Sequence, residues 1–273
     1  MNRKHRKNIR VILAYIFILL CFAGVGYSSF NITKWYLDST KTQKKIYKVQ
    51  DIVDIQTVSG GEVFSVDTKE IDPTSPYWTY IGMDLISVDF TKLKETNSDI
   101  VGWLEVPGTN INYPFMHTDN NEYYLNHSID KSGNSAGWLF MDYRNDPKSL
   151  ERNTIIYAHG RQDETMFGSL KRVLSSTWTS DSNNFIVNMS LENENSLWQV
   201  FSVYHIPTTP DYIQTDFISD EEFITWANNL KQRSSYDFNV ELSAADKILT
   251  LSTCYSAKEK MVLHARLIKT YER

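Results

Sequence analysis

The chain has 273 residues, 41% of them hydrophobic and 13% aromatic, which is enough apolar material for one sizeable folded core. This composition excludes a wholly disordered chain, because such chains lack the apolar side chains that offset the entropy of ordering. The 28 basic and 33 acidic side chains give a formal net charge of −5. That balance argues against a nucleic-acid partner, since phosphate binding needs a basic surface.

The N-terminus differs in composition from the rest of the chain. Residues 1–10 form a basic tail with five Lys and Arg side chains and no acid, and residues 11–27 (VILAYIFILLCFAGVGY) carry no charge. A bilayer span needs about 17–25 apolar residues, and a basic flank favours the cytoplasmic side. We predict a transmembrane signal-anchor over residues 11–27, with the remaining chain outside the cell. A cleaved signal peptide is the alternative, because Gly24 and Gly26 could mimic a small-residue cleavage site.

Residues 28–86 are predicted to form a helical stalk and a linker. The sequence over residues 31–55 is polar with sparse apolar positions and contains neither Pro nor Gly, which permits a continuous helix. Residues 57–76 (TVSGGEVFSVDTKEIDPTSP) are rich in Gly, Ser and Pro, a composition typical of a linker.

Residues 87–273 have the pattern of an all-β domain with added helices. Short apolar runs are separated by turn signals such as Pro107-Gly108 and the ENEN segment before SLWQVF. About eight strands are predicted, too many for a helix-covered parallel sheet and typical of a closed barrel or sandwich. The runs are DIVGWLEV, INYPFM, GWLFMD, NTIIYAHG, NFIVNMSL, SLWQVFSVYHI, KILTLSTC and MVLHARLIK.

Two helices are predicted between these strands. One covers about residues 165–174. The other begins at Ser219, with Glu222 three residues later in the spacing of a capping box. Its apolar positions recur with helical periodicity and are expected to pack on the domain. They are Phe223, Trp226, Ala227 and Leu230.

Cys254 is the only cysteine outside the apolar N-terminal segment, so no disulfide can form within the body of the chain. It is either an inert core side chain or a nucleophile, and a nucleophile needs an imidazole or a cation nearby. His159 suits this role because it ends a buried strand and precedes a glycine, where a side chain can project into a cleft. His205 and His264 lie inside strand patterns, where a packed histidine is the default. No ligand cluster or phosphate loop is present, so we expect neither a metal nor a cofactor.

Several segments resemble a known family. TLSTC is similar to the TLxTC signature of sortases, and IIYAHG is similar to the strand that carries their catalytic histidine. DIVGWLEVPGTNINYPFM, NEYYLNH, GWLFMDYRN and MFGSLKR resemble class B sortases in particular, in the same order along the chain. The resemblance extends from about residue 87 to residue 268. It implies an eight-stranded sortase-type β-barrel with a helix in the connection before the cysteine strand.

The resemblance also implies an activity: a membrane-anchored cysteine transpeptidase, a thiol peptidase by chemistry, outside a Gram-positive cell membrane. Such an enzyme cleaves the C-terminal sorting motif of an exported protein after Thr. Cys254 would hold the acyl group as a thioester, and an amine of a cell-wall precursor or a pilin would accept it. His159 would protonate the leaving amine and deprotonate the incoming one.

The same resemblance implies which side chains line the substrate groove, although ordinary loop and surface packing would also explain them. The implied substrate-binding residues are Asn121, Leu125, Thr208, Tyr212, Ile213 and Ser252.

Sortases have an arginine at the start of the final strand that helps hold the substrate and the oxyanion, and the alignment places Lys260 there. The YSAKE connection has a length usual for hairpins, so Lys260 would lie across from Cys254. Arg266 lies six residues further, about 20 Å at ~3.3 Å per residue, and we expect Arg266→Ala to matter little. Arg161 is a further candidate for the missing cation.

The missing arginine also favours an alternative function: a catalytically weakened sortase-fold protein that binds sorting signals. A papain-like peptidase is not supported, because no CGSCW-like segment surrounds Cys254.

Overall fold

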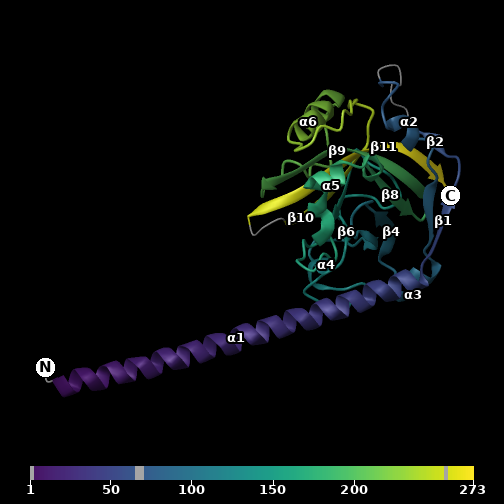
Figure 1. Cartoon of the computed structure of the whole chain (residues 1–273). Helices are drawn as coiled ribbons and strands as arrows, with labels where there is room; N and C mark the ends of the chain where they lie inside the picture. The colour runs from purple at the N-terminus through teal and green to yellow at the C-terminus, as the bar shows by residue number, and fades with distance from the viewer. Residues whose placement is uncertain (1–2, 65–70, 255–257) are drawn as a thin grey trace. The chain divides into compact units, whose positions relative to one another are not determined.

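The computed structural model describes residues 3–64, 71–254 and 258–273, with only the backbone described for residues 3–11 and for Cys254. The chain divides into two compact units, one ending at Lys41 and the other running from Thr42 to Arg273. Helix α1 (Arg3–Ile52) forms the described part of the first unit and continues into the second (Figure 1).

Residues 12–27 of α1, within the first unit, are mostly apolar and exposed. Leu19 and Phe22, for example, are 68% and 72% exposed. By length and composition, α1 is the one helix among the described residues that could cross a membrane. A helix with large apolar side chains on all sides is typical of a membrane span or a signal segment.

The second unit is built on a closed β-barrel (Figure 1). Within the described residues, eight strands follow the order β10-β7-β6-β5-β4-β8-β9-β11, and β11 pairs with β10 again to close the ring. The pairs β10–β7 and β5–β6 are parallel, and the other pairs are antiparallel. The eight-stranded barrel is confirmed. Its strands are β4 (Ile100–Glu105), β5 (Asn112–Met116), β6 (Phe140–Met141), β7 (Asn153–Tyr157), β8 (Ile186–Leu191), β9 (Glu194–Pro207), β10 (Ile248–Cys254) and β11 (Glu259–Glu272).

Short strands occur outside the barrel, in the segment expected to be a linker. β1 (Asp54–Val58) pairs with β3 (Leu85–Asp89), and β2 (Glu62–Val63) pairs with the end of β11. Gly60 and Gly61 make the turn between β1 and β2 with φ of 90° and 97°, a region that side chains with a Cβ rarely adopt. The backbone pairing of β1 and β2 therefore adds ordered structure to a stretch whose composition is typical of a linker.

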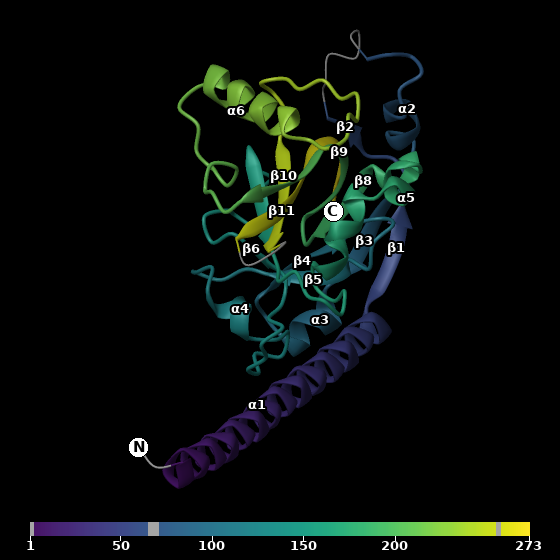
Figure 2. The ribbon, with the colours of Figure 1, turned by 60° about the vertical axis from the view of Figure 1, so that its left-hand side comes forward.

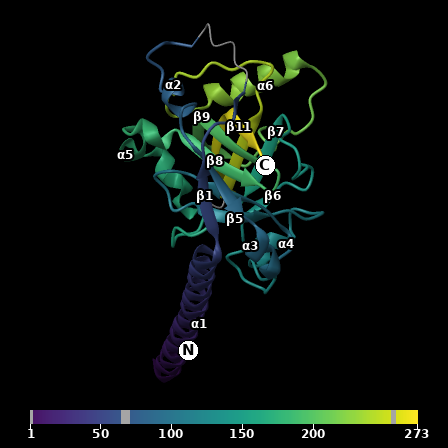
Figure 3. The ribbon, with the colours of Figure 1, turned by 90° about the vertical axis from the view of Figure 1, so that its right-hand side faces the viewer.

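Helix α6 (Asp220–Gln232) begins as predicted. The Ser219 hydroxyl accepts a hydrogen bond from the Glu222 backbone N–H at 3.2 Å, and the Glu222 carboxylate accepts one from the Ile218 N–H at 2.6 Å. The predicted apolar stripe is buried, and the helix packs on β9 (Figure 3). The other helices within the described residues are α2 (Tyr77–Tyr80), α3 (Thr91–Thr96), α4 (Tyr123–Asn126), α5 (Ser176–Thr179) and the 3₁₀ helices η2 (Gly168–Leu174) and η3 (Ser182–Asn184).

The prediction of a helix over about residues 165–174 is wrong in the type of helix and in its first residue. The chain forms the 3₁₀ helix η2, which begins only at Gly168. Glu164 and Met166 have φ of 60° and 52°, which turns the chain back before the helix. A Cβ at Gly168 would come within 2.1 Å of the Arg161 carbonyl oxygen, so the backbone passes itself too closely for another residue.

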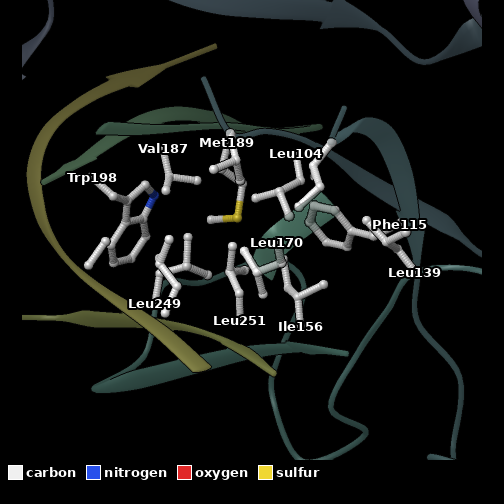
Figure 4. Close-up of a cluster of buried hydrophobic side chains, with 14 of the residues drawn as sticks. Leu104, Phe115, Leu139, Ile156, Leu170, Val187, Met189, Trp198, Leu249 and Leu251 are labelled. Carbon is white, nitrogen blue, oxygen red and sulfur yellow. The ribbon is translucent and has the colours of Figure 1, made fainter. Parts of the chain in front are cut away.

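The turn predicted at Pro107-Gly108 joins β4 to β5. Gly108 has φ of 73°, and a Cβ there would lie 2.7 Å from the Asn184 side chain. The barrel interior is filled by side chains from β4, β5, β7, β8, β9 and β10, together with Leu139 before β6 and Leu170 of η2 (Figure 4). Labelled members of this cluster are Leu104, Phe115, Leu139, Ile156, Leu170, Val187, Met189, Trp198, Leu249 and Leu251.

Candidate active site

The end of β10 places Cys254 opposite Lys260. The Cα atoms of these residues are partners in the antiparallel β10–β11 ladder, and Ser252 is the partner of Tyr157 on the other side, in β7. Figure 2 shows β10 and β11 beside each other. The Cys254 side chain lies outside the described part of the chain, so the geometry of the site is defined by its neighbours. The predicted register between Cys254 and Lys260 agrees with the observed pairing.

His159 lies two residues beyond the end of β7. The Ala158 N–H, next to it, donates to the Ser252 carbonyl at 3.4 Å, which ties this segment to β10. His159 Nε2 lies 2.8 Å from the Leu125 carbonyl oxygen. A carbonyl can only accept, so Nε2 carries a hydrogen and Nδ1 is the nitrogen that can take up or release a second proton.

A cavity of about 510 Å³ lies at this end of the barrel, within the size range of ligand sites. It is bounded by α4 and the loop before it, β6, the end of β7, the loop after β9, the end of β10 and the start of β11. The structure brings together here every predicted site residue whose side chain it describes. These residues are Asn121, Leu125, His159, Thr208, Tyr212, Ile213, Ser252 and Lys260.

Hydroxyl contacts hold parts of this lining in place. The Tyr212 hydroxyl lies 2.9 Å from Ser252 Oγ, and both side chains are buried, so this pair joins the loop after β9 to β10. The Thr208 N–H and hydroxyl both donate to the Lys258 carbonyl, at 3.0 and 3.3 Å. The loop after β9 is therefore fixed on the strand that carries the cysteine and at the start of β11.

Six other lining residues among those that the structure describes were not found from the sequence: Phe140, Tyr157, Ala158, Thr209, Pro210 and Thr253. Tyr157 precedes His159 by two residues, and the period-2 alternation of strands was the signal that could have identified it. Its ring centroid is 5.4 Å from that of Phe140, across the β6–β7 pair.

Both arginines considered as substitutes for the missing cation make other contacts. Arg161 forms an ion pair with Asp163 at 2.7 Å, and its side chain is 8% exposed. Arg266 is opposite Ile248, at the other end of the hairpin, and donates to Gln199 and to the Glu241 carbonyl. Burial lowers the pKa of Arg266 below its ordinary value. Arg266→Ala, which we expect to matter little for activity, should therefore lower the stability of the fold.

Among the described residues, no group of three or more His, Cys, Asp or Glu side chains could hold a metal ion. The chemistry that this site offers is that of a barrel enzyme with a cysteine at a strand end, an imidazole and a cation.

Comparison with known proteins agrees with this chemistry. The model of the Sortase domain family matches residues 104–268. Sortase B of Listeria monocytogenes is 36% identical over 180 residues, 64% of this chain and 72% of the Listeria protein. The structure of sortase B from B. anthracis in complex with AAEK1 has a TM-score of 0.68 and 33% identity, over 86% of this chain and 99% of that one. A Staphylococcus aureus sortase B–substrate complex has a TM-score of 0.62 and 35% identity, over 66% and 84% of the two chains.

The fold and these relatives define a cysteine transpeptidase. The chain belongs to the sortase family and, within it, to class B.

Proposed function

We propose that this sortase cleaves exported proteins after the Thr of a C-terminal sorting motif and joins the Thr carbonyl to an amine of a cell-wall precursor or a pilin. The observation that carries the proposal is the cavity at the end of β10, which collects His159, Lys260 and the expected groove residues in one place. A Staphylococcus aureus relative at 35% identity has been solved as a substrate complex, which supports a peptide as the occupant.

In the proposed reaction, the Cys254 thiolate attacks the Thr carbonyl carbon. The carbon–nitrogen bond breaks, and the leaving amine takes a proton from His159 Nδ1. The Thr acyl group is then held as a thioester. An incoming amine loses a proton to His159 as it attacks, and the thiolate is released when the new amide bond forms.

Lys260 is proposed to stabilise the oxyanion of both tetrahedral intermediates. Its Cα is the ladder partner of Cys254, and its side chain lines the cavity. A lysine acts as a point charge and lacks the two-pronged geometry of an arginine, so it orients the substrate less strictly. The backbone pairing and the cavity support Lys260 over Arg161 and Arg266.

The N-terminus is proposed to anchor the enzyme at the cell membrane as a single-pass protein with its catalytic domain outside the cell. Residues 1–10 would be the cytoplasmic tail, residues 11–27 the signal-anchor, residues 28–86 the stalk and linker, and residues 87–273 the catalytic domain. The length and apolar surface of α1 support an anchor, and they fit a signal segment too. Sequencing the N-terminus of the mature protein from cells distinguishes an anchor from a cleaved signal segment: a start near Ser28 would exclude the anchor.

Intact-mass spectrometry tests the reaction directly. The protein is mixed with a library of short peptides that have a fixed central threonine, and an acyl adduct on the protein is sought. An adduct that disappears when an amine is added supports transpeptidation. Peptide binding without any adduct would instead identify the weakened, binding-only protein that the lysine in place of arginine favours.

A further inference from the structure

We propose that the Asp142–Arg144 ion pair positions three walls of the cavity and thereby sets how tightly the sorting peptide binds. This inference rests on the proposed function, because it takes the peptide to occupy that cavity. Neither residue lines the cavity itself, so both act through the residues that they hold.

The Asp142 carboxylate is fully buried and accepts hydrogen bonds on both oxygens. Oδ1 accepts from the Arg144 backbone N–H at 3.0 Å and from Arg144 Nε at 2.8 Å. Oδ2 accepts from Arg144 Nη2 at 2.7 Å, from the Tyr157 hydroxyl at 2.9 Å and from Asn121 Nδ2 at 3.2 Å. The paired nitrogens of Arg144 thus face both oxygens of the carboxylate, the strong two-pronged arrangement.

Each of these contacts reaches a different wall of the cavity. Asn121 belongs to the loop before α4, and its Oδ1 also accepts from the Tyr143 N–H at 3.0 Å. Tyr157 ends β7, two residues before His159. Ile213 belongs to the loop after β9, and its carbonyl accepts from Arg144 Nη2 at 2.9 Å. Asn121, Tyr157 and Ile213 all line the cavity, and they are far apart in sequence.

Electrostatics keep this pair ionised. Burial raises the pKa of the Asp142 carboxyl, but the bonds from Arg144 and Tyr157 outweigh it and hold that pKa below its ordinary value of 3.8. Burial and the neighbouring carboxylate raise the pKa of Tyr157, so its hydroxyl stays a donor. A carboxylate with a lowered folded-state pKa stabilises the fold above pH 3.8, and the contribution is lost as the pH falls through the lowered value.

Asp142 is fully buried, but the Arg144 side chain is 33% exposed, so desolvation of the carboxylate and solvent screening of the guanidinium make this pair a weak source of net stability. What it supplies is direction: each donor must meet a fixed acceptor. Here the Asp142 carboxylate accepts from Asn121 and Tyr157, and the Ile213 carbonyl accepts from Arg144, so the pair holds one residue in each of three walls of the groove. This is the arrangement expected of a pair that shapes a binding site.

The test is peptide affinity in protein carrying Asp142→Asn. The probe is the member of the threonine-centred peptide library that the unmodified protein binds most tightly, and affinity is measured in a Cys254→Ala background, where no turnover occurs. Asp142→Asn keeps the shape but loses the charge and one acceptor, and we expect the dissociation constant to rise about tenfold or more. Asp146→Asn makes the same chemical change at an exposed position of the same loop and should leave the dissociation constant unchanged.

A second measurement separates positioning from misfolding. With Cys254 present, the rate of alkylation by iodoacetamide, which needs no peptide groove, should change less than about threefold in Asp142→Asn. Tyr157→Phe is a milder variant that keeps the ring and should weaken binding about threefold. In the double variant Asp142→Asn/Tyr157→Phe the two losses should not add, because they break the same contact.

An unchanged dissociation constant in Asp142→Asn overturns the proposal, and so do fully additive losses in the double variant. If Asp142→Asn fails to fold, an unchanged affinity in Tyr157→Phe overturns it. If the unmodified protein binds no library peptide at all, the proposed function fails and this inference fails with it. Binding without acyl transfer removes only the catalytic part of the proposed function.

Discussion

The two ends of the β10–β11 hairpin each place a cation of β11 opposite a residue of β10, yet the two cations have different surroundings. Lys260, opposite Cys254, is half-buried and lines a cavity. Arg266, opposite Ile248, is 2% exposed, bonds to Gln199 and Glu241, and lies 5.5 Å from the Tyr77 ring centroid. Arg266 also borders a cavity, of about 320 Å³, but its near-complete burial and its bonds make it a structural part of the fold, whereas Lys260 keeps an exposed part at the cysteine end.

The largest effect should come from removing the reacting groups at the Cys254 end. We expect Cys254→Ala and His159→Ala each to reduce peptide cleavage by at least about 10³-fold, because the nucleophile and the proton carrier act as a unit. The melting temperature should stay close to that of the unmodified protein. Cleavage and thermal unfolding are measured on the same preparations, and substantial turnover by either variant would refute the assignment.

The comparison of the two cations is tested most directly at Lys260. Lys260→Ala should lower kcat/KM about 10²-fold, the usual loss for one oxyanion donor, with little loss of stability. Lys260→Arg should retain or raise activity, since it restores a two-pronged donor. Steady-state cleavage assays give both values. If Arg161→Ala inactivates the enzyme while Lys260→Ala does not, the cation comes from Arg161.

At the other end of the hairpin, Arg266→Ala should act on stability. The change leaves Gln199 and the Glu241 carbonyl without their donor in a buried site, and we expect a loss of about 3 kcal/mol in the free energy of unfolding. Urea denaturation measures it. Activity per folded molecule should be retained, and a specific loss of kcat at full stability would show that the two ends do not differ as described.

The smallest effect is expected at Tyr212, which bonds to Ser252 beside the cysteine strand. Tyr212→Phe keeps the ring in the groove and removes one buried hydrogen bond, so stability should fall by about 1 kcal/mol and KM should change less than about threefold. Steady-state peptide cleavage by Tyr212→Phe is compared with that of Ser252→Ala, which removes the other partner of the same hydrogen bond. A large loss for Tyr212→Phe alone would mean that the hydroxyl contacts the substrate.

The barrel was predictable because its strands are apolar runs separated by turn residues, and the register at Cys254 followed from the length of the hairpin connection. The Asp142 contacts could not be predicted, because they join Asn121, Tyr157 and Ile213 across large sequence separations. The early turn at Glu164 and Met166 was also hidden, since neither residue type favours a positive φ. Pairwise contacts of this kind leave no periodic pattern in a sequence.

The position of β11 as the last barrel strand in the sequence determines when the active site can assemble. β11 follows every other barrel strand in sequence and pairs with both β9 and β10, so the ring stays open until residues 259–272 have been synthesised. The same strand brings Lys260 opposite Cys254. A partly made chain therefore has its thiol but not its assembled catalytic pocket, and transpeptidation begins only in a molecule that has finished folding.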